Sequence, residues 1–153
     1  MKIAIGADHG AFDRKAEVIE HLRAAGHEVK DFGTYSADSC DYPAIGRSVA
    51  EAVASKEYDR GIVMCTTGIG ISVVANKVKG IRCALCSDVT SAKLTRAHND
   101  ANMLSMGAGI IGPNLTMDIV DMFLNTEFSN EEKHVRRLSQ VAEIERSLFK
   151  EGM

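Results

Sequence analysis

The sequence has no long apolar run, no strong net charge and no segment of low complexity. A membrane span takes about 20 apolar residues, and no run approaches this. The net charge is −3, so the composition gives no reason to expect a nucleic-acid partner. Because the first strand is expected to begin at Lys2, we expect no signal peptide. The chain also has neither a linker nor an internal repeat.

What the chain does have is the size of one domain and enough apolar residues for a core. Its 153 residues fit a single domain, residues 1–153, and 45% of them are hydrophobic. It contains four cysteines, which we expect to stay reduced because no export signal is expected. These features favour a cytoplasmic protein.

Strand-like and helix-like segments alternate along the chain. The expected strands are short apolar runs at 2–7, 27–32, 61–63, 80–86 and 103–106. The expected helices, with apolar residues at helical spacing, cover 12–25, 44–55, 73–78, 89–98, 115–124 and 129–151. This alternation predicts a parallel sheet with helices on both faces. Ligands of such sheets bind beyond the carboxyl ends of the strands.

The last expected helix leaves two interpretations open. It begins at Ser129, whose spacing to Glu132 is that of a capping box. Its apolar residues lie along one side, and they are Val135, Leu138, Val141 and Leu148. A terminal helix of this kind either packs on a partner subunit or covers its own sheet.

The stretch 64–72, with the sequence MCTTGIGIS, combines a cysteine with a glycine-rich turn. Its glycines stand where a strand turns into a helix, so backbone N–H groups and the helix dipole favour an anion there. Cys65 stands beside these amides, which makes its thiol a candidate base or nucleophile. In the structural alternative, Cys65 is a small buried hydrophobe and the glycines serve turn geometry.

Three better-known motifs do not fit the sequence. The glycine pattern lacks the third glycine of a dinucleotide site, and no acidic residue ends the next strand. It also lacks the lysine and Ser/Thr pair of a P-loop. Cys83 and Cys86 have the spacing of a metal or redox pair, but side chains at this offset on a strand point to opposite faces. With no second Cys/His pair to complete a zinc site, we interpret them as buried structural cysteines.

Further polar groups stand at expected strand and helix ends. Asp8 and His9 follow the first strand, 98–100 ends a helix with the sequence HND, and 133–137 is basic, with the sequence KHVRR. Each alone has a structural explanation, as a turn, a helix terminus or a solvated face. Together with Cys65 they provide what proton transfer on an anionic substrate requires.

The chain resembles the ribose-5-phosphate isomerase B family, which includes the galactose-6-phosphate isomerase subunits. The stretches that carry the resemblance are 6–9 (GADH), 31–34 (DFGT), 41–43 (DYP), 65–70 (CTTGIG), 75–82 (ANKVKGIR), 98–102 (HNDAN) and 134–137 (HVRR). The resemblance implies a Rossmann-like three-layer α/β/α fold with a five-stranded parallel sheet and an extra C-terminal helix. It also implies a homodimer or dimer of dimers with active sites between subunits, and no metal or other cofactor.

The family's reaction interconverts a phosphorylated aldose and its ketose through a cis-enediolate. By resemblance, Cys65 is the base that carries the proton between C2 and C1. Thr67 and the backbone amides of Gly68, Ile69 and Gly70 cradle the enediolate oxygen. Donors fixed by the fold stabilise such an oxyanion without reorganising.

The remaining site residues contact other parts of the substrate. Asp8 and His98 help to open the sugar ring. The sugar hydroxyls contact Tyr42 and Asn99. The residues that hold the phosphate are His9, Lys133 and Arg137.

Four positions depart from the family pattern, and one of them is Ser87, which replaces a common histidine or other polar residue. Family members often carry glycine at the position of Thr66, which is an expected substrate contact. They often carry arginine at the positions of Gly109 and Lys133. Ribose 5-phosphate and ribulose 5-phosphate are the first choice of substrate. A hexose phosphate (galactose 6-phosphate or allose 6-phosphate) or an unphosphorylated aldose is the alternative. A non-catalytic subunit or sensor of the same fold is a further possibility, against which the joint presence of Cys65, Thr67 and His98 argues.

Overall fold

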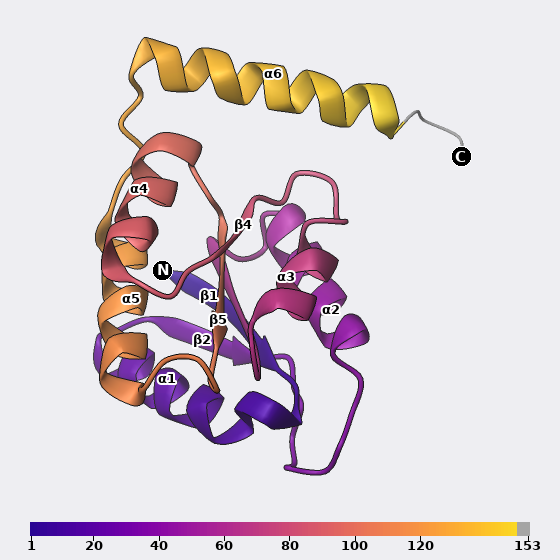
Figure 1. Ribbon diagram of the computed structural model, residues 1–153, viewed down its shortest axis with the longest axis vertical. Coiled ribbons are helices and arrows are strands. Elements are labelled where there is room, and N and C mark those ends of the chain that lie inside the picture. The colour runs from indigo at the N-terminus through magenta and orange to yellow at the C-terminus, as the bar shows by residue number, and fades with distance from the viewer. Residues whose placement is uncertain (150–153) are drawn as a thin grey trace.

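Five strands alternate with helices in the computed structural model of the protein, which describes residues 1–149 (Figure 1). The strands are β1 (Lys2–Ala7), β2 (Glu28–Asp31), β3 (Arg60–Cys65), β4 (Cys83–Leu85) and β5 (Met103–Gly107). The helices are η1 (His9–Ala11), α1 (Phe12–Ala24), α2 (Tyr42–Ala54), α3 (Ile69–Ala75), α4 (Val89–Asn99), α5 (Pro113–Asn125) and α6 (Glu132–Leu148).

All strand pairings are parallel, in the order β2-β1-β3-β5-β4, which confirms the predicted sheet. Ala7 is in register with Met64, and Cys65 with Gly107. The ends of β1, β3 and β5 therefore meet at one edge of the sheet, which we call the C-terminal edge. The edge where the strands begin is the N-terminal edge.

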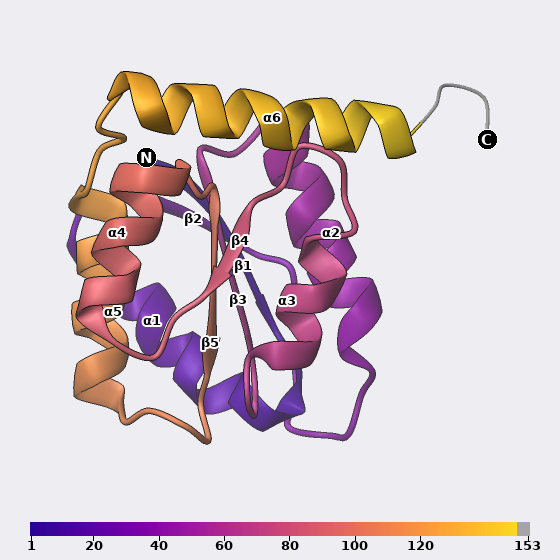
Figure 2. The same cartoon turned by 45° about the horizontal axis from the view of Figure 1, so that its top comes forward.

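The sheet separates two apolar layers. Helices α1, α4 and α5 lie on one side and α2 and α3 on the other (Figure 2). The buried core includes Leu22 and Phe123 in the first layer and Val49 and Ile71 in the second. Cys86 packs in the first layer and Cys83 against the second, as the strand alternation predicts.

The glycine loop turns into a helix earlier than the sequence suggests. Helix α3 begins at Ile69 rather than at residue 73. Its N-cap is Gly68 with φ of 74°, a left-handed conformation that glycine adopts at little cost. The chain can therefore start the helix immediately after Thr67.

Strand β4 is shorter than predicted. It occupies only Cys83–Leu85, because the chain turns at Gly80, with φ of 83°. The side chain of Asn76 then accepts a hydrogen bond from the Cys83 backbone N–H at 2.9 Å. The first residues of the apolar run thus belong to the turn.

The predicted capping box is wrong, although the helix is present. The N-cap of α6 is Glu131. The Ser129 hydroxyl instead lies 2.9 Å from Nδ1 of His134 and accepts from the backbone N–H of Glu131. A serine side chain can hydrogen-bond to several nearby groups, and here Ser129 contacts the His134 imidazole instead of capping the helix at Glu132. The expected helix end at Glu151 lies outside the described residues.

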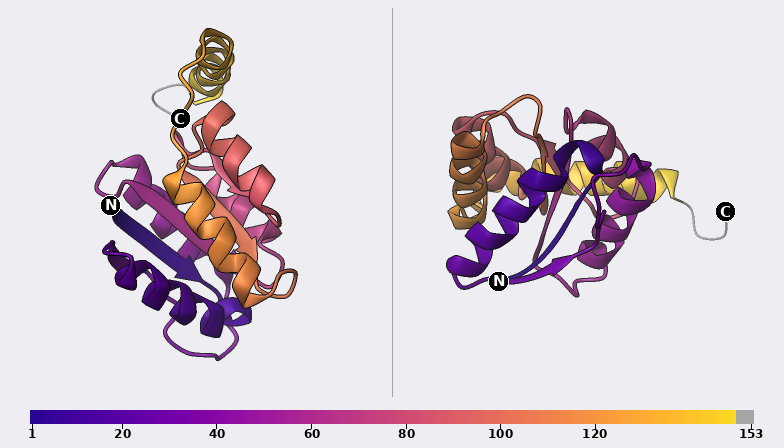
Figure 3. Two further views of the ribbon diagram at one scale, coloured as in Figure 1. Left: turned by 90° about the vertical axis from the view of Figure 1, so that its left-hand side faces the viewer. Right: turned by 90° about the horizontal axis from the view of Figure 1, so that it is seen from below.

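Helix α6 does not cover a face of its own sheet. It crosses beyond the N-terminal edge, beside the end of α4 (Figures 2 and 3). It contacts α4, and Glu145 accepts a hydrogen bond from the Gly80 N–H at 2.8 Å. Its large apolar side chains are mostly exposed, with Val141 at 52%, Ile144 at 60% and Leu148 at 69%. No helix within residues 1–149 is long and apolar enough to cross a membrane.

Candidate active site

The thiol of Cys65 is the best-enclosed reactive group at the C-terminal edge. Cys65 ends the central strand β3 and is 5% exposed. The backbone N–H of Gly68 donates to its sulfur at 3.1 Å. The Ser105 hydroxyl holds the loop in place by donating to the Gly68 carbonyl at 2.6 Å. An N–H aimed at sulfur stabilises the thiolate, the form that accepts a proton.

Thr67 lies next in the loop with an exposed side chain. Its Oγ1 accepts from the Ile69 N–H at 3.2 Å, so its own O–H remains able to donate. The backbone N–H of Gly68 is one of the amides expected to bind the substrate oxygen. In the structure it donates to the Cys65 sulfur instead. This division of donors was not predicted from the sequence.

Asp8 and His9 follow β1 at the same edge. Asp8 is 7% exposed, and one carboxylate oxygen accepts from the Gly10 N–H at 2.9 Å. His9 is exposed, and its Nδ1 accepts from the Cys40 N–H at 3.2 Å. Because an amide can only donate, the proton of neutral His9 is on Nε2, which can donate to an anion.

Thr66 fills the space between two glycines. A Cβ atom placed on Gly109 would lie 2.9 Å from the Thr66 methyl carbon, and one on Gly10 would overlap the Thr66 hydroxyl. Tyr42 lies in the same way against Gly70, where a Cβ would be 2.6 Å from the tyrosine Cζ. Thr66 and Gly109, two of the four departures from the family pattern, therefore pack against each other.

The other predicted residues form a second group, at the N-terminal edge. His98 and Asn99 end helix α4, which runs antiparallel to the strands. The ring of His98 lies 4.3 Å from that of His134 in α6. Burial, and then the neighbouring His98, lower the pKa of His134, which favours its neutral form.

The basic residues of α6 differ in how far they are already paired. Arg136 contacts both carboxylate oxygens of Glu132 at 2.6 Å. Lys133 lies 3.4 Å from a carboxylate oxygen of Glu131. Within residues 1–149, Arg137 makes no ion pair, which leaves its guanidinium able to bind an anion.

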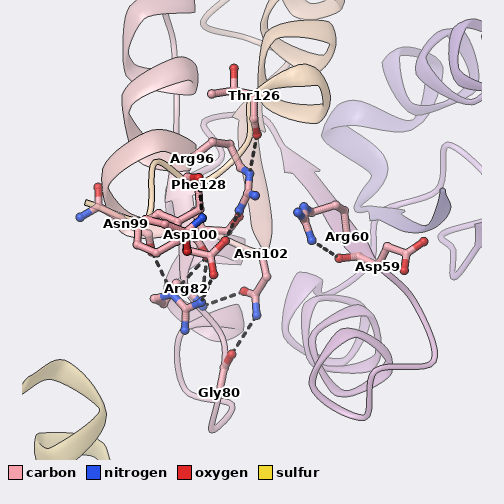
Figure 4. A network of polar contacts seen from close by, with 12 residues as sticks. Asp59, Arg60, Gly80, Arg82, Arg96, Asn99, Asp100, Asn102, Thr126 and Phe128 are labelled. Atoms are coloured by element: carbon pink, nitrogen blue, oxygen red, sulfur yellow. Dashed lines mark hydrogen bonds and ion pairs between the residues drawn. The ribbon is translucent and has the colours of Figure 1, made fainter. Parts of the chain in front are cut away.

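Two arginines that the sequence analysis did not single out hold this second group in place (Figure 4). Arg82 donates to the Asn99 carbonyl at 3.0 Å. Arg96, only 3% exposed, donates to the Asp100 carboxylate at 2.8 Å and to the Thr126 carbonyl at 3.2 Å. These bonds tie the end of α4 to the segment that leads into α6. Arg96 is buried and Arg82 half-buried, and no sequence signal separates such arginines from exposed ones.

The strand register keeps the two groups of residues apart. Cys65 is paired with Gly107 at the end of β5, whereas His98 precedes Met103, where β5 begins. Four residues of strand span about 13 Å at about 3.3 Å each. One copy of the chain therefore presents the two groups at opposite edges of its sheet.

Cys83 and Cys86 are the cysteines whose spacing is that of a metal or redox pair. Among the residues that the structure describes, no group of three His, Cys, Asp or Glu side chains could hold a metal ion. Burial raises the pKa of Cys83 to about 12 and that of Cys86 to about 11, so both thiols stay protonated at neutral pH. This fits their interpretation as structural cysteines.

Comparisons with known proteins agree on one family. The Ribose/Galactose Isomerase family model matches residues 3–141. Ribose-5-phosphate isomerase B of Escherichia coli is 44% identical over 144 residues, 94% of this chain and 96% of that protein. A structure of ribose-5-phosphate isomerase B from Clostridium thermocellum is 49% identical, with a TM-score of 0.94, over 97% of this chain and 99% of that one. The enzyme from Mycoplasma genitalium, solved with bound ribulose-5-phosphate, is 34% identical, with a TM-score of 0.91, over 95% and 96% of the two chains.

Proposed function

Because the chain belongs to the Ribose/Galactose Isomerase family of sugar-phosphate aldose–ketose isomerases, we propose that it interconverts ribose 5-phosphate and ribulose 5-phosphate. The observation that carries this proposal is the enclosed thiol of Cys65, which receives the Gly68 N–H at the C-terminal edge. Ribulose-5-phosphate is also the ligand named for the related Mycoplasma genitalium structure.

The reaction needs one base and one oxyanion site. The Cys65 thiolate takes the proton from C2 of the open-chain aldose, which leaves a cis-enediolate, and returns it to C1, while the hydroxyl proton passes from O2 to O1. Thr67 donates to the oxygen on which charge develops. Removal of one such donor costs about 3–4 kcal/mol of transition-state stabilisation in known oxyanion holes.

A complete site requires a second copy of the chain. His98, Asn99, Lys133 and Arg137 at the N-terminal edge of one copy complete the group around Cys65 in another. The exposed apolar residues of α6 support this assembly, since a partner would cover them. We assign ring opening to Asp8 with His98 of the second copy, and sugar hydroxyls to Tyr42 and Asn99. The dimer or dimer of dimers thus forms its active sites between subunits.

The phosphate is held by groups from both copies. His9 donates through Nε2–H, and Arg137 and Lys133 of the second copy supply positive charge. Lysine offers a point charge rather than the planar fork of arginine, and Gly109 offers no charge. Because the site has fewer guanidinium groups to bind a phosphate, a hexose phosphate or an unphosphorylated aldose stays the second candidate substrate.

An assay over pentose phosphates, hexose phosphates and free aldoses tests the proposed substrate. We expect the highest kcat/KM with ribose 5-phosphate. A higher kcat/KM with galactose 6-phosphate, allose 6-phosphate or free allose would favour the alternative. No turnover of any of these sugars by a folded protein would instead favour a sensor or non-catalytic subunit.

The Thr66–Gly109 contact predicts that an arginine at 109 is tolerated only when Thr66 is removed. Gly109→Arg alone should lower activity, because the new Cβ would lie 2.9 Å from the Thr66 methyl carbon. In a Thr66→Gly background the methyl contact is gone, and the nearest remaining atom is the backbone carbonyl oxygen of residue 66 at 3.0 Å, a tight contact that needs a shift of a few tenths of an ångström. There the added guanidinium should lower KM for ribose 5-phosphate about tenfold or more, since a charge-assisted bond contributes about 1.5–3 kcal/mol.

Kinetics on ribose 5-phosphate and free allose, with Thr66→Gly alone as the control, measure this effect. The gain should be absent with allose, which has no phosphate. An unchanged KM for ribose 5-phosphate in the double variant would show that position 109 does not face the phosphate.

A further inference from the structure

Lys15 is a buried cation with no place in the mechanism above. It lies on α1 and is 2% exposed, which is rare for lysine. Its Nζ donates to both carboxylate oxygens of Asp31, at 2.7 and 2.9 Å, and to the backbone carbonyl of Thr34. Such a buried pair adds little net stability compared with apolar packing, so stability alone is a weak reason for it.

The pair anchors the start of the loop 33–41, which connects β2 to α2. Asp31 also accepts from the Gly33 N–H at 2.8 Å. The Gly33 carbonyl in turn accepts from the Ala7 N–H at 2.8 Å, and the Thr34 N–H donates to the Ala7 carbonyl at 2.6 Å. The start of the loop therefore holds both backbone groups of Ala7, the residue directly before Asp8.

The end of the same loop reaches the next residue of the site. The Cys40 N–H donates to Nδ1 of His9 at 3.2 Å, the bond that sets which ring nitrogen carries the proton. The loop thus contacts the segment 7–9 at both of its ends. Any shift of the loop would move Asp8 and reorient His9.

Packing alone does not hold the loop at its start. A surface cavity of about 690 Å³ lies beside the Lys15–Asp31 pair, and Tyr35 at its rim is 73% exposed. With open space on this side, the start of the loop is held by the ion pair with its hydrogen bonds and by the two backbone hydrogen bonds to Ala7.

We propose that Lys15 is a positioning residue for Asp8 and His9, acting through Asp31 and the loop 33–41. The inference rests on the proposed function, in which Asp8 assists ring opening and His9 holds the phosphate. Lys15 touches neither substrate nor reacting atoms. Its contribution is to keep two site residues in the productive geometry, where small displacements are costly.

The test compares Lys15→Met with Lys30→Met. Lys30 precedes Asp31 on β2 and is exposed, so the control makes the same substitution beside the same loop. For Lys15→Met we expect kcat/KM on ribose 5-phosphate to fall about tenfold or more, with a raised KM because His9 is displaced. Lys30→Met should stay within about twofold of the wild type.

Hydrogen exchange separates positioning from a general loss of stability. In Lys15→Met the amides of residues 33–41 should exchange faster, while those of β5 remain protected. If Lys15→Met does not fold, Asp31→Asn replaces it, since asparagine keeps an acceptor for Gly33 but loses the charge that holds Lys15. Asp31→Asn should show the same local exchange and a smaller loss of kcat/KM.

Two results in a folded Lys15→Met or Asp31→Asn protein would overturn the inference. One is unchanged hydrogen exchange of residues 33–41, and the other is a kcat/KM within twofold of the wild type. Failure of the proposed function has a different signature, namely a wild-type protein that turns over no sugar phosphate. In that case the exchange comparison still tests whether Lys15 orders the loop.

Discussion

Replacing Cys65 by alanine should lower kcat for ribose 5-phosphate about a thousandfold or more while KM changes by less than about threefold. The thiol is 5% exposed, lies at the end of the central strand and receives the Gly68 N–H at its sulfur. The substitution removes the proton acceptor. It leaves Thr67, His9 and the groups that we propose a second copy supplies available to bind substrate.

Exchange of the substrate's C2 hydrogen with deuterated solvent measures this step directly. Cys65→Ala should show no exchange above background, even though it still binds ribose 5-phosphate. Cys83→Ala is the matched control, because burial raises the pKa of Cys83 to about 12 and it lies outside the site. Near-normal exchange by Cys65→Ala would mean that another base acts, and the buried carboxylate of Asp8 would be the first to test.

The sheet, its parallel strands and the helices on both faces could be predicted because alternation and apolar spacing are local properties of the sequence. The start of α3 could not, since it depends on Gly68 taking a left-handed conformation that glycine permits but does not require. The role of Ser129 was also missed. Its partner, His134, is set by how α6 docks against α4, which is a tertiary event.

The residues at the C-terminal edge were predictable because they follow strands, and parallel strands end together. The roles of Lys15 and Ser105 could not be predicted, because they depend on partners distant in sequence. Lys15 contacts Asp31 and Thr34, and Ser105 contacts Gly68. A lysine on a helix looks like a surface residue until the fold places an acid beside it.

Predicting where His98 lies requires both its motif and the topology of the sheet. A helix that returns between parallel strands ends at the edge where the next strand begins. His98 therefore lies at the N-terminal edge, opposite Cys65, and proximity of the two within one copy is excluded by the register of β5. The resemblance implied sites between subunits, and this geometry supports the proposal of a shared site.

The central claim is that each active site takes Cys65 from one copy of the chain and His98 from another. Subunit mixing tests it most directly, because Cys65→Ala and His98→Asn would damage complementary halves of the site. In a hybrid dimer, one site carries both substitutions and the other carries none. Random reassembly places half of the chains in hybrids, so about a quarter of the wild-type activity should appear from two nearly inactive proteins.

The measurement is turnover of ribose 5-phosphate after the two variants are unfolded and refolded together, with each variant refolded alone as the control. Differently tagged chains report how many hybrids form. Recovery of activity in proportion to the hybrid fraction is the result we predict. Hybrids that form but remain as inactive as either parent would contradict a site shared between subunits.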